Sequence, residues 1–173
     1  QMEKLPITFG ALNLLKRVDL SCNRLTVLPE NLDNMLSCTT LIVNKNRLVR
    51  LPRCISRMPS LTSLSASCNQ ITYVPEDISN NRTLQILRLG ANRINHIVDR
   101  IGDMKQLTEL SLEYNLIPRL PISFHMLSNL VQLRIDGNLA LCDPTAEVLA
   151  QGATGVVKYM RRKYAEDQTY LMR

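Results

Sequence analysis

The sequence predicts a curved, right-handed solenoid of the α/β class, with a parallel sheet on the concave face and short helices or turns on the convex face. Three observations support this prediction: an asparagine recurs every 23 residues, apolar residues keep fixed spacings around it, and a Leu-Pro or Val-Pro pair follows in most copies. A chain of 173 residues has room for one domain rather than two. A single repeat array therefore accounts for nearly the whole chain.

The recurring asparagine defines the repeat. Its positions are Asn23, Asn46, Asn69, Asn92, Asn115 and Asn138. An apolar residue lies five and three positions before each of them, as Leu110 and Leu112 lie before Asn115. This alternation is typical of a short strand with two inward-pointing side chains. Because one such strand cannot bury its apolar face alone, we expect the copies to stack into a parallel sheet with a continuous core.

We expect the six asparagines to be structural. Each one stands where the chain leaves a strand, so its amide group can satisfy backbone groups of neighbouring turns that would otherwise be buried and unpaired. A ligand-binding role is disfavoured, because the register does not vary from one copy to the next.

The full motif combines the strand with the segment that follows it. It has the pattern LxxLxLxxNxL followed by xxLPxxIxxLxx, in which Leu51, Pro52 and Ile55 illustrate the second half. This pattern resembles the leucine-rich repeat, in the 23-residue intracellular type of Ras-pathway scaffolds, Scribble-like and Erbin-like proteins and plant intracellular relatives. The resemblance covers about residues 5 to 164. It implies a horseshoe fold and a protein-interaction module of a signalling scaffold or adaptor, with small GTPases or phosphatase subunits as candidate partners.

The two ends of the chain depart from the pattern. We expect residues 1–14 to form a partial N-terminal repeat, residues 15–142 the repeats themselves, and residues 143–173 a C-terminal capping helix with a basic tail. Leu5 and Pro6 already occupy the Leu-Pro positions, so the chain is expected to be a fragment of a longer protein. Asp143 is expected to cap the C-terminal helix, with Pro144 in its first turn and one apolar stripe through residues 148–160.

Composition indicates the cellular location of the protein but does not select a class of partner. The formal net charge is +6, from 21 Lys and Arg against 15 Asp and Glu, which suits several kinds of acidic partner and selects none. No run of about 18 apolar residues occurs, so we expect no membrane span. Five cysteines without a CxxC pair favour a reducing, cytoplasmic location. Nothing in the pattern indicates an oligomeric state.

Residues suited to catalysis are sparse. His96 and His125 fall at unmatched positions of neighbouring repeats, without a cysteine or carboxylate pair at ligand spacing. No glycine-rich phosphate-binding motif occurs. We therefore expect no enzymatic activity, no catalytic or metal site and no cofactor. The triplet Asn81-Arg82-Thr83 matches a glycosylation sequon, which we interpret as a chance match.

The outward-pointing strand positions form the predicted protein-binding surface. Small side chains leave an open floor there, while Ile42, Ile86 and Tyr114 expose apolar area. Tyrosine and arginine are the residue types that most often carry interface energy. The residues expected to bind a partner on this concave face are Lys45, Arg88, Glu113, Tyr114, Arg134 and Asp136. The charge of this face changes along the axis, from Lys16, Arg17 and Lys45 early to Glu109, Glu113 and Asp136 late, which would orient a partner.

A second predicted surface is basic. Arg24, Arg47 and Arg93 share the position directly after the asparagine, and residues 34–75 contain no acidic residue. The basic residues of that stretch are Lys45, Arg47, Arg50, Arg53 and Arg57. We interpret this rim as solvated, with contact to an acidic protein as the alternative. Nucleic acid is disfavoured, because aromatic residues for base stacking are few.

Three other functions remain open at this point. The chain could be the recognition segment of a larger GTPase, kinase or ubiquitin ligase, a structural subunit of an assembly such as a cilium or ribonucleoprotein, or an immune-type sensor. Asn81 stands in a position that Met or Leu fills in other repeats. That exception indicates either a local loop adjustment or a contact with another subunit.

Overall fold

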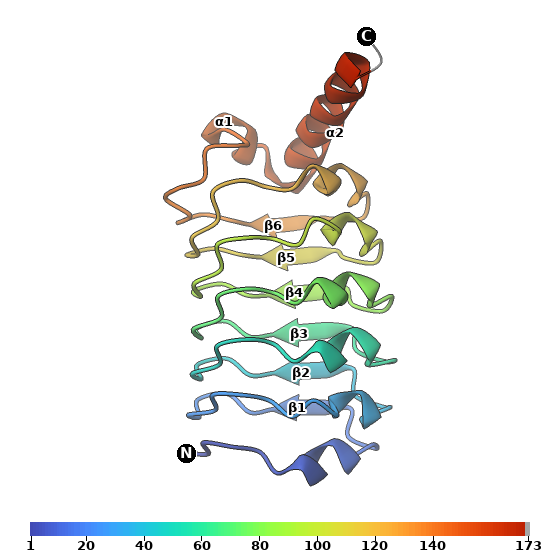
Figure 1. The fold of residues 1–173 in the computed structure, drawn as a ribbon, viewed down its shortest axis with the longest axis vertical. Coiled ribbons are helices and arrows are strands. Elements are labelled where there is room, and N and C mark those ends of the chain that lie inside the picture. Colours follow the sequence, from blue (N-terminus) through green and yellow to red (C-terminus); the bar gives the residue numbers. More distant parts are fainter. Residues whose placement is uncertain (172–173) are drawn as a thin grey trace.

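Six short parallel strands stack in sequence order along one side of the molecule in the computed structural model, which describes residues 1–171 (Figure 1). The strands are β1 (Arg17–Asp19), β2 (Thr40–Ile42), β3 (Ser63–Ser65), β4 (Ile86–Arg88), β5 (Glu109–Ser111) and β6 (Gln132–Arg134). Residues 23 positions apart face each other across every pair, as Val18 faces Leu41 and Leu87 faces Leu110. The 23-residue period of the sequence is thus the register of the sheet.

A 3₁₀-helix precedes each strand in the chain and lies on the opposite side of the array (Figure 1). These helices are η1 (Ile7–Ala11), η2 (Leu32–Asn34), η3 (Arg53–Arg57), η4 (Glu76–Asn80), η5 (Ile101–Asp103) and η6 (Ile122–Met126). Four of them begin directly after the proline of the Leu-Pro or Val-Pro pair or after Pro6, namely η1, η3, η4 and η6. Proline fixes φ near the helical value and needs no N–H partner, so it suits the entry to a helix.

The core lies between the sheet and these helices. The middle residue of each strand points inward, and all are buried except Leu133 of β6, which is half-buried because no further strand covers it. The helices contribute the facing residues Leu32, Ile55, Ile78, Ile101 and Phe124, each at most 3% exposed. One continuous apolar cluster therefore runs through all the repeats, and no repeat has a core of its own.

The repeated asparagines hold the corners at which the chain leaves the strands. Asn46 donates from Nδ2 to the carbonyls of Leu20, at 2.9 Å, and Val43, at 3.1 Å, while its Oδ1 accepts the Leu25 N–H at 3.0 Å. Leu20 and Leu25 belong to the preceding repeat. The same bonds recur at Asn69, Asn92, Asn115 and Asn138. Each asparagine therefore joins two turns and satisfies backbone groups that water cannot reach.

The residue before each asparagine has a left-handed backbone. These residues are Cys22, Lys45, Cys68, Ala91, Tyr114 and Gly137, with φ between 53° and 73°. For a residue with a Cβ this conformation costs about 1–2 kcal/mol. Five of the six positions carry such a residue, so the asparagine bonds and the sheet register must together hold the turn in place.

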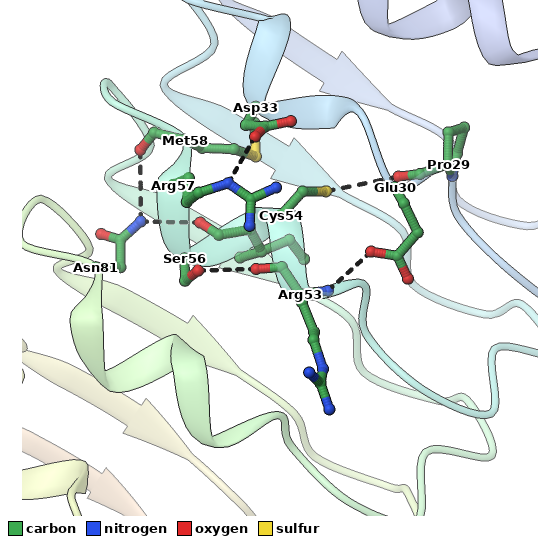
Figure 2. A network of polar contacts seen from close by, with 10 residues as sticks. Pro29, Glu30, Asp33, Arg53, Cys54, Ser56, Arg57, Met58 and Asn81 are labelled. Carbon is green, nitrogen blue, oxygen red and sulfur yellow. Dashed lines mark hydrogen bonds and ion pairs between the residues drawn. The ribbon is translucent and has the colours of Figure 1, made fainter.

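Asn81 makes a second kind of asparagine contact, on the convex side (Figure 2). Its side chain is 2% exposed, and Nδ2 donates to the carbonyl of Ile55 at 3.0 Å. Its Oδ1 accepts the N–H groups of Thr83 and Leu84, at 3.0 and 2.8 Å. Asn81 therefore belongs to a local loop arrangement, and its amide is buried away from any glycosylating enzyme.

The C-terminal region differs in detail from the sequence prediction. The first helix, α1 (Ala146–Leu149), has Thr145 and not Asp143 at its N-cap. The prediction for Asp143 was wrong because its carboxylate is used elsewhere: it accepts the Tyr159 hydroxyl at 2.8 Å and forms an ion pair with Lys163.

The expected single apolar stripe is also interrupted. Gly152, with φ of +70°, separates α1 from α2 (Gly152–Leu171), so the chain changes direction inside the predicted helix. The apolar side of α2 packs on η6 and buries Ala153, Val156, Val157 and Met160. Within residues 1–171, no helix combines the length and the apolar character needed to cross a bilayer.

Replacing Asn92 with alanine should lower the free energy of unfolding by about 2–4 kcal/mol, because the buried carbonyl of Ala66 and the buried N–H of Ile71 each lose a hydrogen-bond partner. Chemical denaturation measures this loss. Asn95→Ala is the matched control, since Asn95 is exposed in the same repeat and should change stability by less than about 0.5 kcal/mol. Equal effects of the two substitutions would contradict the structural role of the corner asparagine.

Candidate functional site

Five of the six predicted binding residues gather at one end of the concave face. Arg88 lies on β4, Glu113 follows β5, and Arg134 lies on β6. Tyr114 follows Glu113 after β5, and Asp136 occupies after β6 the position that Glu113 occupies after β5. Lys45 lies apart, after β2, and β3 separates it from this group. The structure therefore brings together Arg88, Glu113, Tyr114, Arg134 and Asp136, which we call the β4–β6 cluster.

Arg88 is already engaged within the protein. Its Nε and Nη2 donate to the two carboxylate oxygens of Glu109, at 2.7 and 2.8 Å. The Arg88 hydrogen bond holds the pKa of Glu109 below its ordinary value, and the same contact raises the pKa of Arg88. The Glu109 side chain is only 12% exposed, whereas that of Arg88 is 44% exposed. Arg88 therefore presents a fixed, half-exposed guanidinium edge and not a free cation.

Sequence reasoning did not select Glu109. The signal was available, because Glu109 lies 21 positions after Arg88 and is thus a diagonal neighbour on the next strand. Diagonal pairs of that kind are within reach of long side chains. Sequence alone does not decide whether a diagonal pair forms or whether both side chains stay in solvent.

Glu113 and Tyr114 each pack against a glycine of a neighbouring repeat. A Cβ on Gly90 would lie 2.3 Å from Glu113 Oε1, and a Cβ on Gly137 would lie 2.4 Å from Tyr114 Cδ1. The carboxylate of Glu113 also accepts the Ser111 hydroxyl at 2.5 Å. Gly90, in the preceding repeat, thus leaves space for Glu113, and Gly137, in the following repeat, leaves space for Tyr114. The sequence prediction included neither contact.

Tyr114 is 67% exposed. Its ring is held against the backbone at Gly137 and its own backbone is left-handed, with φ of 55°. An aromatic ring fixed in this way loses little further freedom when it is covered by a partner. Tyr114 is therefore well suited to be an interface anchor.

The last strand supplies a cation that carries no acidic partner. Arg134 is exposed, and its Nε and Nη2 donate to the side-chain oxygen of Gln132, at 2.9 and 2.8 Å, when that amide oxygen faces Arg134. Among residues 1–171, no carboxylate lies within 4.0 Å of Arg134 or pairs with it. Asp136 is exposed after the same strand, so the cluster offers charges of both signs to a partner.

Polar contacts also link the ends of β2 and β3. Asn44, after β2, accepts from the Ser65 hydroxyl and from the Ser67 N–H, both at 2.8 Å. The outward strand positions there are Thr40 and Ile42 on β2 and Ser63 and Ser65 on β3. Lys45 is exposed and has no hydrogen bond from its ammonium group among the described residues.

The reactive residue types are dispersed. In the part of the chain that the structure describes, no group of three or more His, Cys, Asp or Glu side chains could hold a metal ion. His125 stacks on Tyr164 with ring centroids 4.2 Å apart, and exposed His96 lies 4.0 Å from Asp99. All five thiols are free, and burial raises the pKa of Cys38 and Cys54.

Comparison with protein families and solved structures agrees with this architecture. The leucine rich repeat family model matches residues 13–71 and 82–139. The PEPR1–AtPEP1 crystal structure is 27% identical, with a TM-score of 0.72, over 79% of this chain and 20% of that chain. A comparison with curated proteins returned no match.

Two further solved structures are similar. The ectodomain of the Arabidopsis thaliana membrane receptor kinase GASSHO1/SCHENGEN3, in complex with CASPARIAN STRIP INTEGRITY FACTOR 2, is 28% identical, with a TM-score of 0.69, over 76% of this chain and 16% of that chain. An internalin of Listeria monocytogenes is 23% identical, with a TM-score of 0.68, over 78% of this chain and 38% of that chain, and shows the fold alone. The chain thus spans a fifth or less of the two plant proteins.

Gly137→Ala should destabilise the protein by about 1–2 kcal/mol, because the new Cβ would strain a left-handed backbone and would displace the Tyr114 ring. Gly90→Ala is the matched comparison, since it displaces only the flexible end of Glu113 and should cost less. Thermal or chemical denaturation gives both values. A larger loss for Gly90→Ala would contradict the packing described for Tyr114.

Arg88→Met should reduce stability in a pH-dependent way. Because the pKa of Glu109 is lower in the folded protein than its ordinary value of 4.5, ionised Glu109 stabilises the fold above that value, and the contribution disappears as pH falls through the lowered pKa. We expect a loss of about 1 kcal/mol at neutral pH, small because Arg88 is half-exposed, and a smaller loss in acid.

Urea denaturation at neutral and at acidic pH tests this expectation. Arg93→Met is the control, since Arg93 is exposed and makes no ion pair among residues 1–171, so its effect should not change with pH. A loss for Arg88→Met that stays constant from neutral to acidic pH would show that the Glu109 pair contributes no stability.

Proposed function

Because the chain belongs to the leucine-rich repeat family, we propose that it is a non-catalytic module that holds an extended protein or peptide segment against the β4–β6 cluster. The observation that carries this proposal is the exposed ring of Tyr114, which packs on Gly137, together with exposed Arg134 on the last strand, which forms no ion pair among residues 1–171. A rigid aromatic side chain next to arginine is the combination in which interface energy most often concentrates.

Shape and charge favour a segment that crosses the strands. The outward serines of β3, Ser63 and Ser65, are small, whereas the β4–β6 cluster supplies larger side chains for contact. Lys45 at one end and Asp136 at the other give the face opposite charges along its axis. A partner with complementary charges would bind in one orientation and would associate faster at low salt.

The structural neighbours support a peptide or protein as the partner. Two of them are complexes with named partners, PEPR1 with AtPEP1 and GASSHO1/SCHENGEN3 with CASPARIAN STRIP INTEGRITY FACTOR 2. Both share more than a quarter of their residues with this chain over the aligned part. The family is typically a binding module, which supports a non-catalytic role for this chain as well.

We further propose a signalling scaffold or adaptor in the cytoplasm, of the intracellular repeat type, with a small GTPase or a phosphatase subunit as the partner class. The 23-residue period and the five free thiols support this narrower proposal. Three of these thiols, on Cys22, Cys68 and Cys142, are exposed.

A second candidate function is the recognition segment of a larger multidomain enzyme. It is favoured by the neighbour GASSHO1/SCHENGEN3, a membrane receptor kinase, of which this chain matches 16% of the resolved ectodomain. The full reading frame of the gene distinguishes the two: a catalytic domain in the same frame supports the second candidate, and repeats or other binding domains alone support the scaffold.

Selection of random peptides displayed on phage against the immobilised protein tests the main proposal. Selected peptides should bind at least about tenfold more weakly to the double variant Tyr114→Ala with Arg134→Ala, because both anchors are lost. Calorimetry or fluorescence anisotropy measures the change in Kd. Both residues are exposed, so circular dichroism should be unchanged.

The matched control is Arg161→Ala with Tyr164→Ala, which removes the same residue types from α2, away from the concave face, and also removes the stacking of Tyr164 on His125. It should change Kd by less than about twofold. If the selected peptides bind the concave variant as tightly as the wild type, the β4–β6 cluster is not the binding site.

A further inference from the structure

A second charged surface follows the corner at which the chain leaves each strand. Its core is the position directly after the asparagine, occupied by Arg24, Arg47 and Arg93. The same backbone bond fixes each of them to the preceding turn: the Arg24 N–H donates to Met2, at 2.8 Å, Arg47 to Leu25 and Arg93 to Ile71, both at 2.9 Å. Together with the adjacent cations Lys45, Arg50 and Arg119, these residues form what we call the arginine edge.

The cations of the arginine edge have no acidic partner within the described residues, unlike arginines elsewhere. Arg57 bonds to Asp33 at 2.8 Å on the convex side (Figure 2), Arg88 to Glu109 at 2.7 Å on the concave face, and Arg100 to Asp103 at 2.7 Å. In contrast, all six side chains of the arginine edge are exposed and lie farther than 4.0 Å from any carboxylate of residues 1–171. Their charge is therefore available to another molecule.

Two of the three acidic residues in the groove beside Arg50 interact with Arg53. Arg50 and Tyr73 line an open groove of about 410 Å³ together with Glu30, Glu76 and Asp77. Figure 2 shows that Glu30 accepts the backbone N–H of Arg53, at 3.1 Å. The Arg53 guanidinium lies 3.7 Å from Asp77. Two of the three groove acids thus face Arg53, which leaves Arg50 unpaired.

Exposed apolar side chains alternate with these cations. Val27 is 43% exposed, Val49 45%, Tyr73 49% and Leu116 58%, and all four belong to the same corner segments. A purely solvated rim would not need apolar side chains at these positions, and a sugar-phosphate backbone would leave them uncovered. The combination fits a polypeptide that carries both acidic and apolar residues.

We propose that the arginine edge binds an acidic polypeptide segment in polyproline II conformation, running parallel to the solenoid axis. Neighbouring strands are about 4.8 Å apart, so Arg47 and Arg93, two repeats apart, are separated by about 10 Å. A polyproline II segment repeats its side-chain direction every three residues, over about 9.3 Å. Acidic residues three positions apart in the partner therefore match Arg47 and Arg93, and apolar residues between them cover Val49 and Tyr73.

This surface is independent of the β4–β6 cluster. It shares no residue with the β4–β6 cluster, and Lys45 alone belongs to both the concave face and the arginine edge. A partner could occupy both at once, with the acidic segment adding to the affinity of the concave contact through a high effective concentration.

A synthetic peptide made of Glu-Pro-Val repeats is the probe, because it places a carboxylate every third residue and favours polyproline II. Fluorescence anisotropy at low ionic strength gives its Kd for the whole chain. The double variant Arg47→Glu with Arg93→Glu should bind at least about tenfold more weakly, since two attractive contacts become repulsive.

Two controls separate specific binding from general charge attraction. Lys158→Glu with Arg161→Glu removes the same net charge from exposed positions of α2 and should change Kd by less than about twofold. A peptide of the same composition, with its glutamates grouped at one end, should bind more weakly than the regular repeat. The concave variant Tyr114→Ala with Arg134→Ala should keep full affinity for the probe.

Four results would overturn the proposal: no measurable binding of the probe to the wild type, an equal loss of affinity in the α2 control, loss of probe binding in the concave variant alone, or tighter binding of single-stranded polythymidine that the edge variant abolishes. The last result would assign the edge to nucleic acid. Loss of probe binding in the concave variant alone would place the peptide on the β4–β6 cluster instead.

Discussion

The structure depends on the buried corner at which each strand ends. The chain turns there with its carbonyl and N–H groups facing the core, and an asparagine side chain is suited to satisfy them because one amide supplies both an acceptor and two donors. Asn46, for example, bonds to carbonyls of its own repeat and of the preceding one and accepts an N–H from that preceding repeat. This contact fixes the distance between repeats, and it explains why the chain tolerates a left-handed backbone at residues such as Lys45 and Tyr114.

A fixed register converts the sequence into rows of side chains. Residues 23 positions apart lie side by side, so the outward strand positions form the concave face and the positions after the asparagines form the arginine edge. Within the concave face, tertiary contacts then sort the charged residues. Arg88 is paired with Glu109, whereas Arg134 is turned toward a neutral amide and remains free of carboxylates within residues 1–171. The face therefore has both a rigid part and an available part, which suits the recognition of a partner without large rearrangement.

The convex side and the C-terminal cap contain residues that depart from the repeat pattern without disrupting the array. Asn81 replaces the Met or Leu of other repeats on the convex side (Figure 2). It compensates for the lost apolar contact by satisfying the carbonyl of Ile55 and two N–H groups of its own loop. After β6, the apolar side of α2 covers η6, and Asp143 connects the last turn to α2 through Tyr159 and Lys163. Each exception uses polar contacts that are complete within the fold, and this distinguishes them from the unpaired arginines of the corner.

The sequence by itself determined the repeat, its period, the strand positions, the buried asparagines and the rows of outward residues. These features follow from the 23-residue spacing, which is the same in every repeat. Only the tertiary structure decided which neighbours in those rows interact. The Arg88–Glu109 pair, the space that Gly90 and Gly137 leave for Glu113 and Tyr114, and the use of Asp143 by Tyr159 depend on side-chain directions between turns. Gly152 likewise begins α2 with a left-handed backbone that an apolar period cannot reveal. Periodicity fixes where a residue lies in a repeat array, whereas the choice among its several neighbours is made by packing and hydrogen bonding in three dimensions.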